Sequence, residues 1–231
     1  MPLEVLKERI SELGRPRNFF RSVVDDRHPD AMRVIAEVKR KSPSAGVIRA
    51  DFDPVKIALE YQAAGASCLS VLTDEMFFQG SLDYLAAIRA AVDLPVVGVG
   101  RFKDPLQADR ALAEGICDMV GVVRGQIADP DFAAKARSGH AAEIRTCLSC
   151  NQECVGRMGL NRWLGCIENP RTGRESLGIG IGRAAARVKN VMVVGAGPAG
   201  LQAAIAAARN GHRVVVYEKQ SVAGGQVRVA A

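Results

Sequence analysis

Short apolar runs alternate with amphipathic stretches along much of this chain. The runs at 34–38, 68–72, 96–99 and 119–123 are typical of strands buried in a parallel sheet. Each is followed by a stretch that carries a helix start signal, either Asp-Pro (53–54, 104–105 and 129–130) or Ser81. The expected helix ends are marked by Gly65, Gly115 and Gly139. Strands that alternate with helices over short connections predict an α/β fold with a parallel sheet.

The alternating region is too short for a closed eight-stranded barrel. A further helix is predicted over residues 3–13, where Leu3, Leu6, Ile10 and Leu13 recur at helical spacing before Gly14 and Pro16. The four strand–helix units occupy about 110 residues, whereas a full (βα)8 barrel takes about 250. We therefore predict a half barrel over residues 1–139.

Two further regions follow the predicted half barrel. Residues 140–189 are rich in Cys, Gly, Arg and Asn and contain the chain's single tryptophan, which favours a loop region held by a metal. From residue 190 a strand, a glycine turn, a helix and a second strand predict a βαβ unit over 190–231. This unit is shorter than the roughly 100 residues typical of a nucleotide-binding domain, so it is expected to be truncated.

Four cysteines in the middle region form the most complete candidate ligand set. Cys147, Cys150, Cys154 and Cys166 follow the spacing C-x2-C-x3-C-x11-C. Three thiolates on one tight loop and a fourth from farther along the chain suit a 4Fe–4S cluster, which is held by four cysteine sulfurs. A structural zinc site and two disulfides are the alternatives. Cys68 and Cys117 lie in or beside predicted strands and are expected to be core thiols.

The glycine turn of the last region indicates a dinucleotide site. Gly195, Gly197 and Gly200 follow an apolar strand and open a helix, and Glu218 closes the next strand. In this pattern the glycines allow a tight turn, a close approach of a pyrophosphate and tight helix–strand packing, while the acid binds ribose hydroxyls. The adjoining Gly-Pro-Ala-Gly and the later Gly224-Gly225-Gln226 favour FAD over NAD. A glycine turn without a ligand is the alternative.

Composition narrows the class of partner. The net charge of +6 is modest for 231 residues, and the arginines are scattered without interleaved aromatic residues, so nucleic acid is not the expected partner. Small phosphorylated ligands explain this charge as well as nucleic acid does, and solubility alone explains it best. Small phosphorylated ligands or flavin are the expected partners. No apolar run is long enough for a membrane span and no secretory signal is visible, which favours a cytoplasmic protein.

Residues 1 to about 95 resemble the indole-3-glycerol-phosphate synthases, the (βα)8 lyases of tryptophan biosynthesis. The resemblance rests on the strings at 35–46 (IAEVKRKSPSAG), 64–66 (AGA), 70–74 (SVLTD) and 78–82 (FQGSL). It implies that Glu37 and Lys39 face the substrate, that Ser42 belongs to a loop over the site, and that Phe78 contacts the anthranilate ring. The family's third-strand lysine, a general acid, is missing, because the chain reads VGVGR at 97–101. The glutamate general base of the fourth strand has no counterpart either, which implies loss of the lyase reaction.

Residues from about 95 to 231 resemble a second family, the old-yellow-enzyme-like iron–sulfur flavoproteins typified by 2,4-dienoyl-CoA reductase and trimethylamine dehydrogenase. The shared features are Gly100-Arg101, the string at 118–121 (DMVG), Arg124, the string at 128–130 (ADP), the cysteine array and the FAD-type turn. The resemblance implies an FMN phosphate site at Gly100, Arg101, Val123 and Arg124. The strands that hold the flavin ring in that family have no counterpart here, which implies weak FMN binding.

We interpret the chain as a chimera of the two families with its seam near residues 94–97. The favoured function is electron transfer through a 4Fe–4S cluster and flavin in an oxidoreductase fragment whose catalysis is impaired. The alternatives are an indole-3-glycerol-phosphate synthase and a non-catalytic fusion product. An open half barrel would expose its edge strands and an inner face built from Ile35, Leu72, Val97 and Val120. A homodimer is therefore expected if the chain is soluble, and aggregation otherwise.

Overall fold

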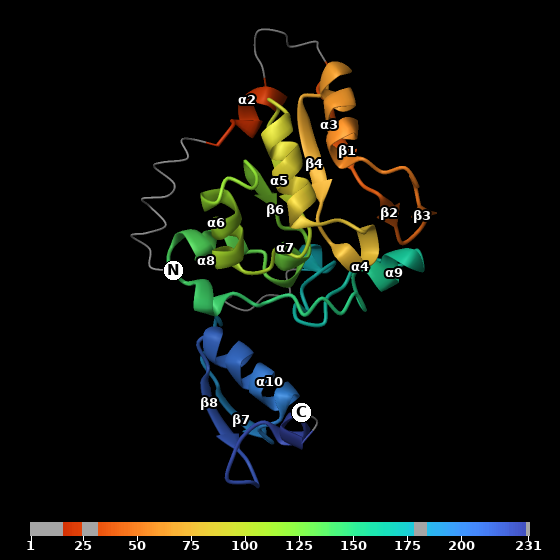
Figure 1. Cartoon of the computed structure of the whole chain (residues 1–231). Helices are drawn as coiled ribbons and strands as arrows, with labels where there is room; N and C mark the ends of the chain where they lie inside the picture. The colour runs from red at the N-terminus through yellow and green to blue at the C-terminus, as the bar shows by residue number, and fades with distance from the viewer. Residues whose placement is uncertain (1–15, 25–31, 178–183, 230–231) are drawn as a thin grey trace. The chain divides into compact units, whose positions relative to one another are not determined.

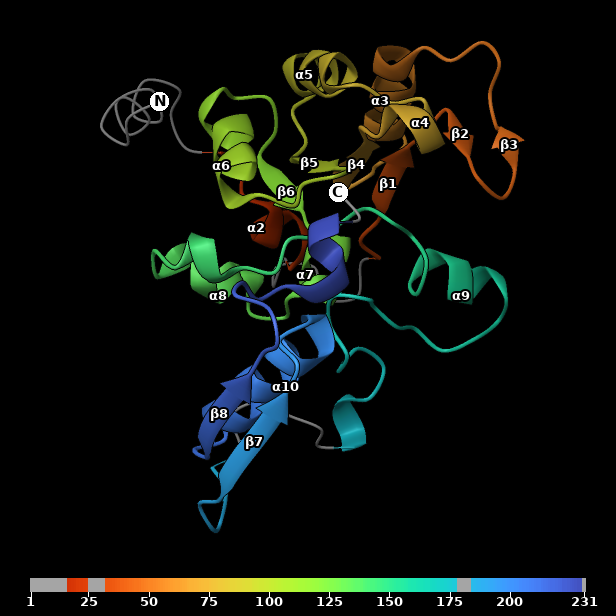
Figure 2. The same cartoon turned by 90° about the horizontal axis from the view of Figure 1, so that it is seen from below.

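The computed structural model describes residues 16–24, 32–177 and 184–229. These residues form two compact units, divided between Asn169 and Pro170. The helix predicted over 3–13 lies outside the described residues. The first unit (Figure 1) contains a parallel sheet in the order β1-β4-β5-β6. Its strands are therefore neighbours in the order in which they occur along the chain, as the labels in Figure 2 show. The strands are β1 (Ile35–Val38), β4 (Cys68–Leu72), β5 (Val96–Val99) and β6 (Met119–Gly121). All four predicted strands are therefore confirmed to within two residues.

The helices that follow these strands begin largely where the sequence predicts. Asp53 caps α3 (Pro54–Ala63), Ser81 caps α5 (Leu82–Ala91) and Asp104 caps α6 (Pro105–Ala113), each by accepting backbone amides. The fourth start signal is wrong. Helix α8 (Phe132–Arg137) begins two residues after the Asp129-Pro130 pair. The buried Asp129 carboxylate accepts the Asp131 amide, as a cap would, but it also accepts hydrogen bonds from Lys135 and Arg145.

Several short elements in the first unit have no counterpart in the sequence prediction. A hairpin of β2 (Lys41–Ser42) and β3 (Gly46–Val47) follows β1, and α4 (Glu75–Phe78) follows β4. Helix α7 (Arg124–Ala128) starts directly after β6. The remaining short helices are α2 (Phe19–Val23), η1 (Ala141–Glu143) and α9 (Val155–Gly159). These pieces are too short for periodicity to reveal, and α4, α7 and the hairpin all lie at the carboxyl edge of the sheet.

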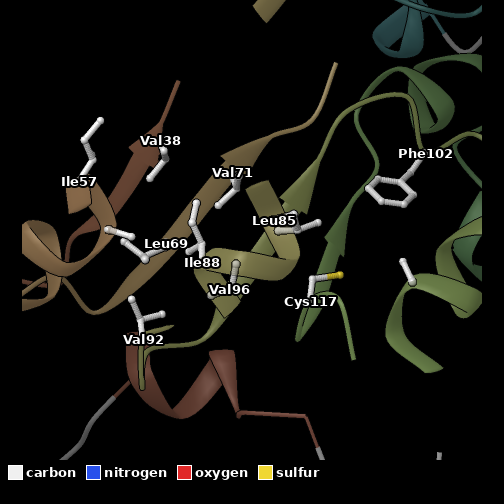
Figure 3. Close-up of a cluster of buried hydrophobic side chains, with 12 residues drawn as sticks. Val38, Ile57, Leu69, Val71, Leu85, Ile88, Val92, Val96, Phe102 and Cys117 are labelled. Carbon is white, nitrogen blue, oxygen red and sulfur yellow. The ribbon is translucent and has the colours of Figure 1, made fainter. Parts of the chain in front are cut away.

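The core lies between one face of the sheet and helices α3, α5 and α6 (Figure 2). Leu69, Val71 and Val96 from the strands pack with Leu85 and Ile88 of α5, and all five are almost fully buried (Figure 3). Cys68 and Cys117 are confirmed as buried free thiols. Burial raises the pKa of both, that of Cys117 to about 11.

The other face of the sheet differs from the prediction at one position. Val120 packs against the helix-covered core, so it does not belong to the inner face. Strand residues alternate between faces, and the register pairs Ser70 with Val97 and Val97 with Met119. On β6, the residues on the inner face are therefore Met119 and Gly121, and not Val120 as predicted. Ile35, at the outer strand β1, is 49% exposed.

The second unit is a small βαβ arrangement. Strands β7 (Asn190–Val194) and β8 (Arg213–Tyr217) pair in parallel, and α10 (Pro198–Arg209) connects them. Two short 3-10 segments, η2 (Glu175–Leu177) and η3 (Gly225–Val229), lie in the same unit. Among all described residues, no helix combines the length and the apolar character that a membrane span requires.

Candidate functional site

A cavity of about 260 Å³ lies at the carboxyl edge of the four-stranded sheet. Segments after all four strands line it, which is where parallel α/β folds place their ligands. Its lining includes four basic and two acidic side chains, namely Lys39, Arg101, Lys103 and Arg124 against Glu37 and Asp74. The surplus of positive charge suits an anionic ligand.

The residues expected from the synthase resemblance fall into two groups. Glu37, Lys39 and Phe78 all line the cavity, and Lys39 Nζ lies 2.5 Å from Glu37 Oε1. Ser42 is not one of the lining residues. Its hydroxyl accepts a hydrogen bond from the Ala45 amide at 3.1 Å and thereby stabilises the turn between β2 and β3.

The predicted phosphate residues are brought together in the same cavity. Gly100, Arg101, Val123 and Arg124 all line it. Gly100 has φ of +144°, and a Cβ there would lie 2.9 Å from the Asp74 amide nitrogen, so only glycine lets β5 end so close to that chain segment. Arg101 and Arg124 come from the ends of β5 and β6 and are positioned as a pair.

Asp74 is a member of this site that the sequence prediction missed. Its side chain is 1% exposed, and its Oδ2 lies 2.5 Å from Arg101 Nε and 3.9 Å from Arg124 Nη2. Its Oδ1 accepts the Phe77 amide at 3.0 Å and so caps α4. A position two residues beyond the end of a buried parallel strand was the signal available in the sequence. Lys103 also lines the cavity and was also missed by the sequence prediction.

The four cysteines of the array surround a second, smaller cavity. Cys147, Cys150, Cys154 and Cys166 all line this space of about 20 Å³, and all four are free thiols. The Ser149 amide donates to Cys147 Sγ at 3.4 Å, and both Ser149 and Asn151 have positive φ, which makes the loop tight. Across the described residues, no group of three or more His, Cys, Asp or Glu side chains is arranged to hold a metal ion. The four thiols thus line one cavity.

Two buried polar residues attach the cysteine segment to the chain around α7. Asp129 accepts the Arg145 amide at 2.9 Å, two residues before the first cysteine. Burial alone would raise the Asp129 pKa, but hydrogen bonds from Lys135, Arg145 and Asp131 outweigh it and hold the pKa below its ordinary value. At the other end of the segment, Asn169 Nδ2 donates to the Ile127 carbonyl at 2.9 Å.

The cavity at the carboxyl edge of the sheet, called the larger cavity below, shares a wall with the cysteine-lined cavity. Cys147 and Arg124 line both of them. Arg124 Nη1 donates to Asn151 Oδ1 at 2.6 Å, so one guanidinium contacts the cysteine loop and faces the larger cavity. A group bound by the thiols and a ligand in the larger cavity would therefore be neighbours.

The glycine turn of the second unit has the expected backbone geometry. Gly195 has φ of +99°, and a Cβ on Gly200 would collide with the Gly195 carbonyl oxygen. A Cβ on Gly197 would point into open space, which leaves room for a ligand. Glu218 accepts the Gln220 amide at 2.9 Å and the Ala196 amide at 2.6 Å, and these bonds lower its pKa. The acid at the end of β8 thus lies against the turn at the end of β7.

The later glycine pair also lies at this turn. The Gly224 amide donates to the Ala196 carbonyl at 2.8 Å, and a Cβ on Gly225 would lie 3.0 Å from Gly197 Cα. Both glycines have positive φ. The second unit therefore gathers all of its predicted cofactor residues around one turn.

Two family models match different parts of the chain, as the two sequence resemblances predict. The model for indole-3-glycerol phosphate synthase matches residues 1–133, and the model for FAD dependent oxidoreductase matches residues 190–230. The first match continues through the predicted seam at 94–97, whose position stays a prediction.

Individual relatives also fall into two groups, oxidoreductases and indole-3-glycerol phosphate synthases. An NADH oxidase of Thermoanaerobacter brockii is 46% identical over 164 residues, which are 70% of this chain and 25% of that protein. An indole-3-glycerol phosphate synthase of Rhodopirellula baltica is 59% identical over 86 residues, 37% of this chain and 33% of that protein. The solved 2-naphthoyl-CoA reductase complex superposes with a TM-score of 0.73 at 30% identity, over 84% of this chain and 31% of that one. The chain thus spans a quarter to a third of these proteins.

Proposed function

Residues 1–133 place this chain in the indole-3-glycerol phosphate synthase family, but we propose that the activity it retains is of the oxidoreductase type. The proposed function is electron transfer between a 4Fe–4S cluster held by the four cysteines and a flavin or other small phosphorylated ligand in the larger cavity. The observation that carries the proposal is the shared wall, since Cys147 and Arg124 line both cavities.

The donor set of the smaller cavity fits a cluster. Thiolates are the ligands that iron–sulfur clusters use, and Cys147, Cys150, Cys154 and Cys166 are free and face one space. A structural zinc ion held by the same four thiolates is the alternative, and the metal content decides between the two. When bound, the cluster would supply one-electron chemistry. The Ser149 amide would donate to the Cys147 thiolate and stabilise its negative charge.

The larger cavity would hold the anionic part of the partner molecule. Arg101 and Arg124 present guanidinium groups, which match phosphate oxygens in geometry and charge. For a flavin the relevant group is the FMN phosphate, as the flavoprotein resemblance implies. In the second unit, Gly195, Gly197 and Gly200 with Glu218 would hold part of FAD, the phosphate at the start of α10 and the ribose at the acid.

Anaerobic reconstitution with iron and sulfide tests the proposal. We expect about four iron atoms and matching acid-labile sulfide per chain, with broad visible absorption. Cys154→Ser should lose most of the iron, whereas Cys68→Ala, which removes a buried thiol remote from both cavities, should keep it. Stoichiometric zinc and no iron after the same treatment would contradict the proposal.

A lyase is the second candidate, because Glu37, Lys39 and Phe78 line the larger cavity together with Lys103. Lys103 is a lysine beyond the end of β5, so it is the group that could replace the missing general acid. We still expect no measurable conversion of the synthase substrate, a carboxyphenylamino-deoxyribulose phosphate, because the general base has no counterpart. Turnover within about tenfold of an ordinary kcat of about 10 per second, and its loss in Lys103→Met, would favour the lyase.

A further inference from the structure

The larger cavity contains an unusual charge arrangement at its phosphate side. Arg101 and Arg124 lie in the segment that resembles the flavoproteins, but the carboxylate between them, Asp74, comes from the segment that resembles the synthases. Asp74 Oδ2 lies 2.5 Å from Arg101 Nε and 3.9 Å from Arg124 Nη2, and its side chain is 1% exposed. The joining of the two segments has therefore placed an internal anion against both guanidinium groups.

We infer that Asp74 acts as a built-in counter-anion. It partly neutralises the positive charge of Arg101 and Arg124 and thereby sets the affinity of the larger cavity for phosphate. This inference rests on the anion-binding role proposed above for that cavity and does not depend on the cluster. It assigns Asp74 as a specificity-determining residue and phosphate-bearing small molecules as the ligand class.

Burial makes the carboxylate hard to displace. A buried carboxylate that loses its cationic partner is left with an uncompensated charge, which costs free energy. An incoming phosphate therefore cannot replace Asp74 as the partner of Arg101 without that cost. The phosphate must share the guanidinium groups with Asp74, since Nε of Arg101 is already engaged and Arg124 also donates to Asn151. Two like charges within a few ångströms repel, and the repulsion is screened little at a partly buried position.

Other charged groups around the cavity do not remove this repulsion. Lys39 is paired with Glu37 at 2.5 Å, so those two charges balance each other. Lys103 is the remaining cation in the lining, which leaves the phosphate side with three basic groups against one carboxylate. Removing the Asp74 charge would turn a partly neutralised pair of arginines into a strong dianion site.

Asp74→Asn is the variant of choice because it removes the charge and little else. Asparagine has the same shape and caps helices as well as aspartate, so the bond from the Phe77 amide to α4 can be kept. Asp104→Asn is a matched control. Asp104 also caps a helix, α6, by accepting the Leu106 amide, and it does not line the cavity.

Calorimetric titration of the protein with inorganic phosphate at constant ionic strength and pH 7 tests the inference. We expect Asp74→Asn to bind phosphate about tenfold or more tightly than the parent protein, since removal of one nearby like charge is worth at least one decade in Kd. Asp104→Asn should match the parent protein. Adding Arg101→Gln to Asp74→Asn should abolish the gain. A second variant, Asp74→Ser, keeps a capping oxygen without charge and should behave like Asp74→Asn if the latter folds poorly.

Two outcomes would overturn the inference. Equal or weaker phosphate binding by both Asp74 variants would mean that the carboxylate orients the arginines for the ligand or has no influence on it. Absence of phosphate binding by the parent protein and both variants would mean that the cavity is not an anion site. Iron content is measured separately, so a failure of cluster loading with a gain in phosphate binding would count against the electron-transfer proposal alone.

Discussion

Asp129 is the residue whose replacement should most affect the attachment of the cysteine segment. Its side chain is 4% exposed and accepts three hydrogen bonds, from Lys135 Nζ at 2.6 Å, the Arg145 amide at 2.9 Å and the Asp131 amide at 3.1 Å. In Asp129→Asn only one side-chain oxygen remains. Whichever way the amide turns, its NH2 group faces at least one of these donors.

The size of the effect follows from these bonds. A hydrogen bond to a buried charged group contributes about 1.5–3 kcal/mol, and an amide left without an acceptor costs about 1–3 kcal/mol. Lys135 is 26% exposed and can turn to water, so its share is discounted. We expect Asp129→Asn to lower the free energy of unfolding of the first unit by about 2–3 kcal/mol, which corresponds to roughly 4–12 °C in Tm.

Urea unfolding followed by tryptophan fluorescence measures this effect in the right unit. Trp163 is the only tryptophan of the chain and lies in the cysteine segment of the first unit. Asp131→Asn is the control, because Asp131 is exposed at the start of α8 and its side chain makes no capping bond, so its loss should cost under about 1 kcal/mol. Equal destabilisation by the two variants would refute the reasoning.

The pH dependence gives an independent check. The Asp129 pKa is lowered in the folded protein, so its contribution to stability is present above the ordinary aspartate pKa of about 3.9 and is lost as the pH falls through the lower folded value. The stability difference between the parent protein and Asp129→Asn should therefore be constant near neutrality and shrink only below about pH 4. A difference that already shrinks between pH 8 and pH 6 would point to another group.

Three further predictions concern other parts of the chain. Gly200→Ala should destabilise the second unit, since the added Cβ would collide with the Gly195 carbonyl oxygen, and circular dichroism during heating would detect a separate early transition. In protein without metal at pH 8, iodoacetamide should label exposed Cys150 well before Cys117, whose thiol is buried with a pKa raised to about 11, and peptide mass spectrometry would show the order. The open sheet, with β1 and β6 as its outer strands, should pair with a second copy, so light scattering at micromolar concentration should give twice the 24.6 kDa of one chain, and a stable monomer would contradict this.

Periodicity and capping signals predicted most of the regular structure. The four strands are continuous apolar runs, and Asp53, Ser81 and Asp104 cap helices as expected, because these signals are local to a few residues. Asp129 has the same local sequence pattern, yet its carboxylate also accepts a hydrogen bond from the backbone amide of Arg145, 16 residues later in the chain. A local pattern carries no information about such a distant partner.

The candidate site was predictable in its parts and not in its assembly. Each family resemblance supplied its own residues, and Glu37 and Arg101 do line one cavity. What could not be foreseen is the contact across the two segments, since Asp74 and Arg101 lie 27 residues apart in the sequence and neither carries a local signal for the other. Ser42 shows the opposite case, where a residue implied by resemblance stabilises a turn beside the site.

The predicted seam near residues 94–97 places contacts of the same kind at both ends of β5. At the carboxyl end, Asp74 of the synthase-like segment pairs with Arg101 of the flavoprotein-like segment. At the amino end the roles are exchanged, since Asp118, with a side chain 1% exposed, lies 2.9 Å from Arg89 Nε, although that nitrogen has no hydrogen bond of good geometry.

The hydrogen bonds of the strands continue across the same join. The Thr73 amide donates to the Val99 carbonyl at 2.8 Å, and the Leu69 amide donates to the Pro95 carbonyl at 3.0 Å. Buried carboxylates without partners would be costly at a random junction, and here each has an arginine from the other segment. A seam near residues 94–97 is therefore compatible with a sheet whose buried carboxylates are paired, and the pairing of Asp74 with Arg101 at the carboxyl end also shapes the charge distribution of the larger cavity.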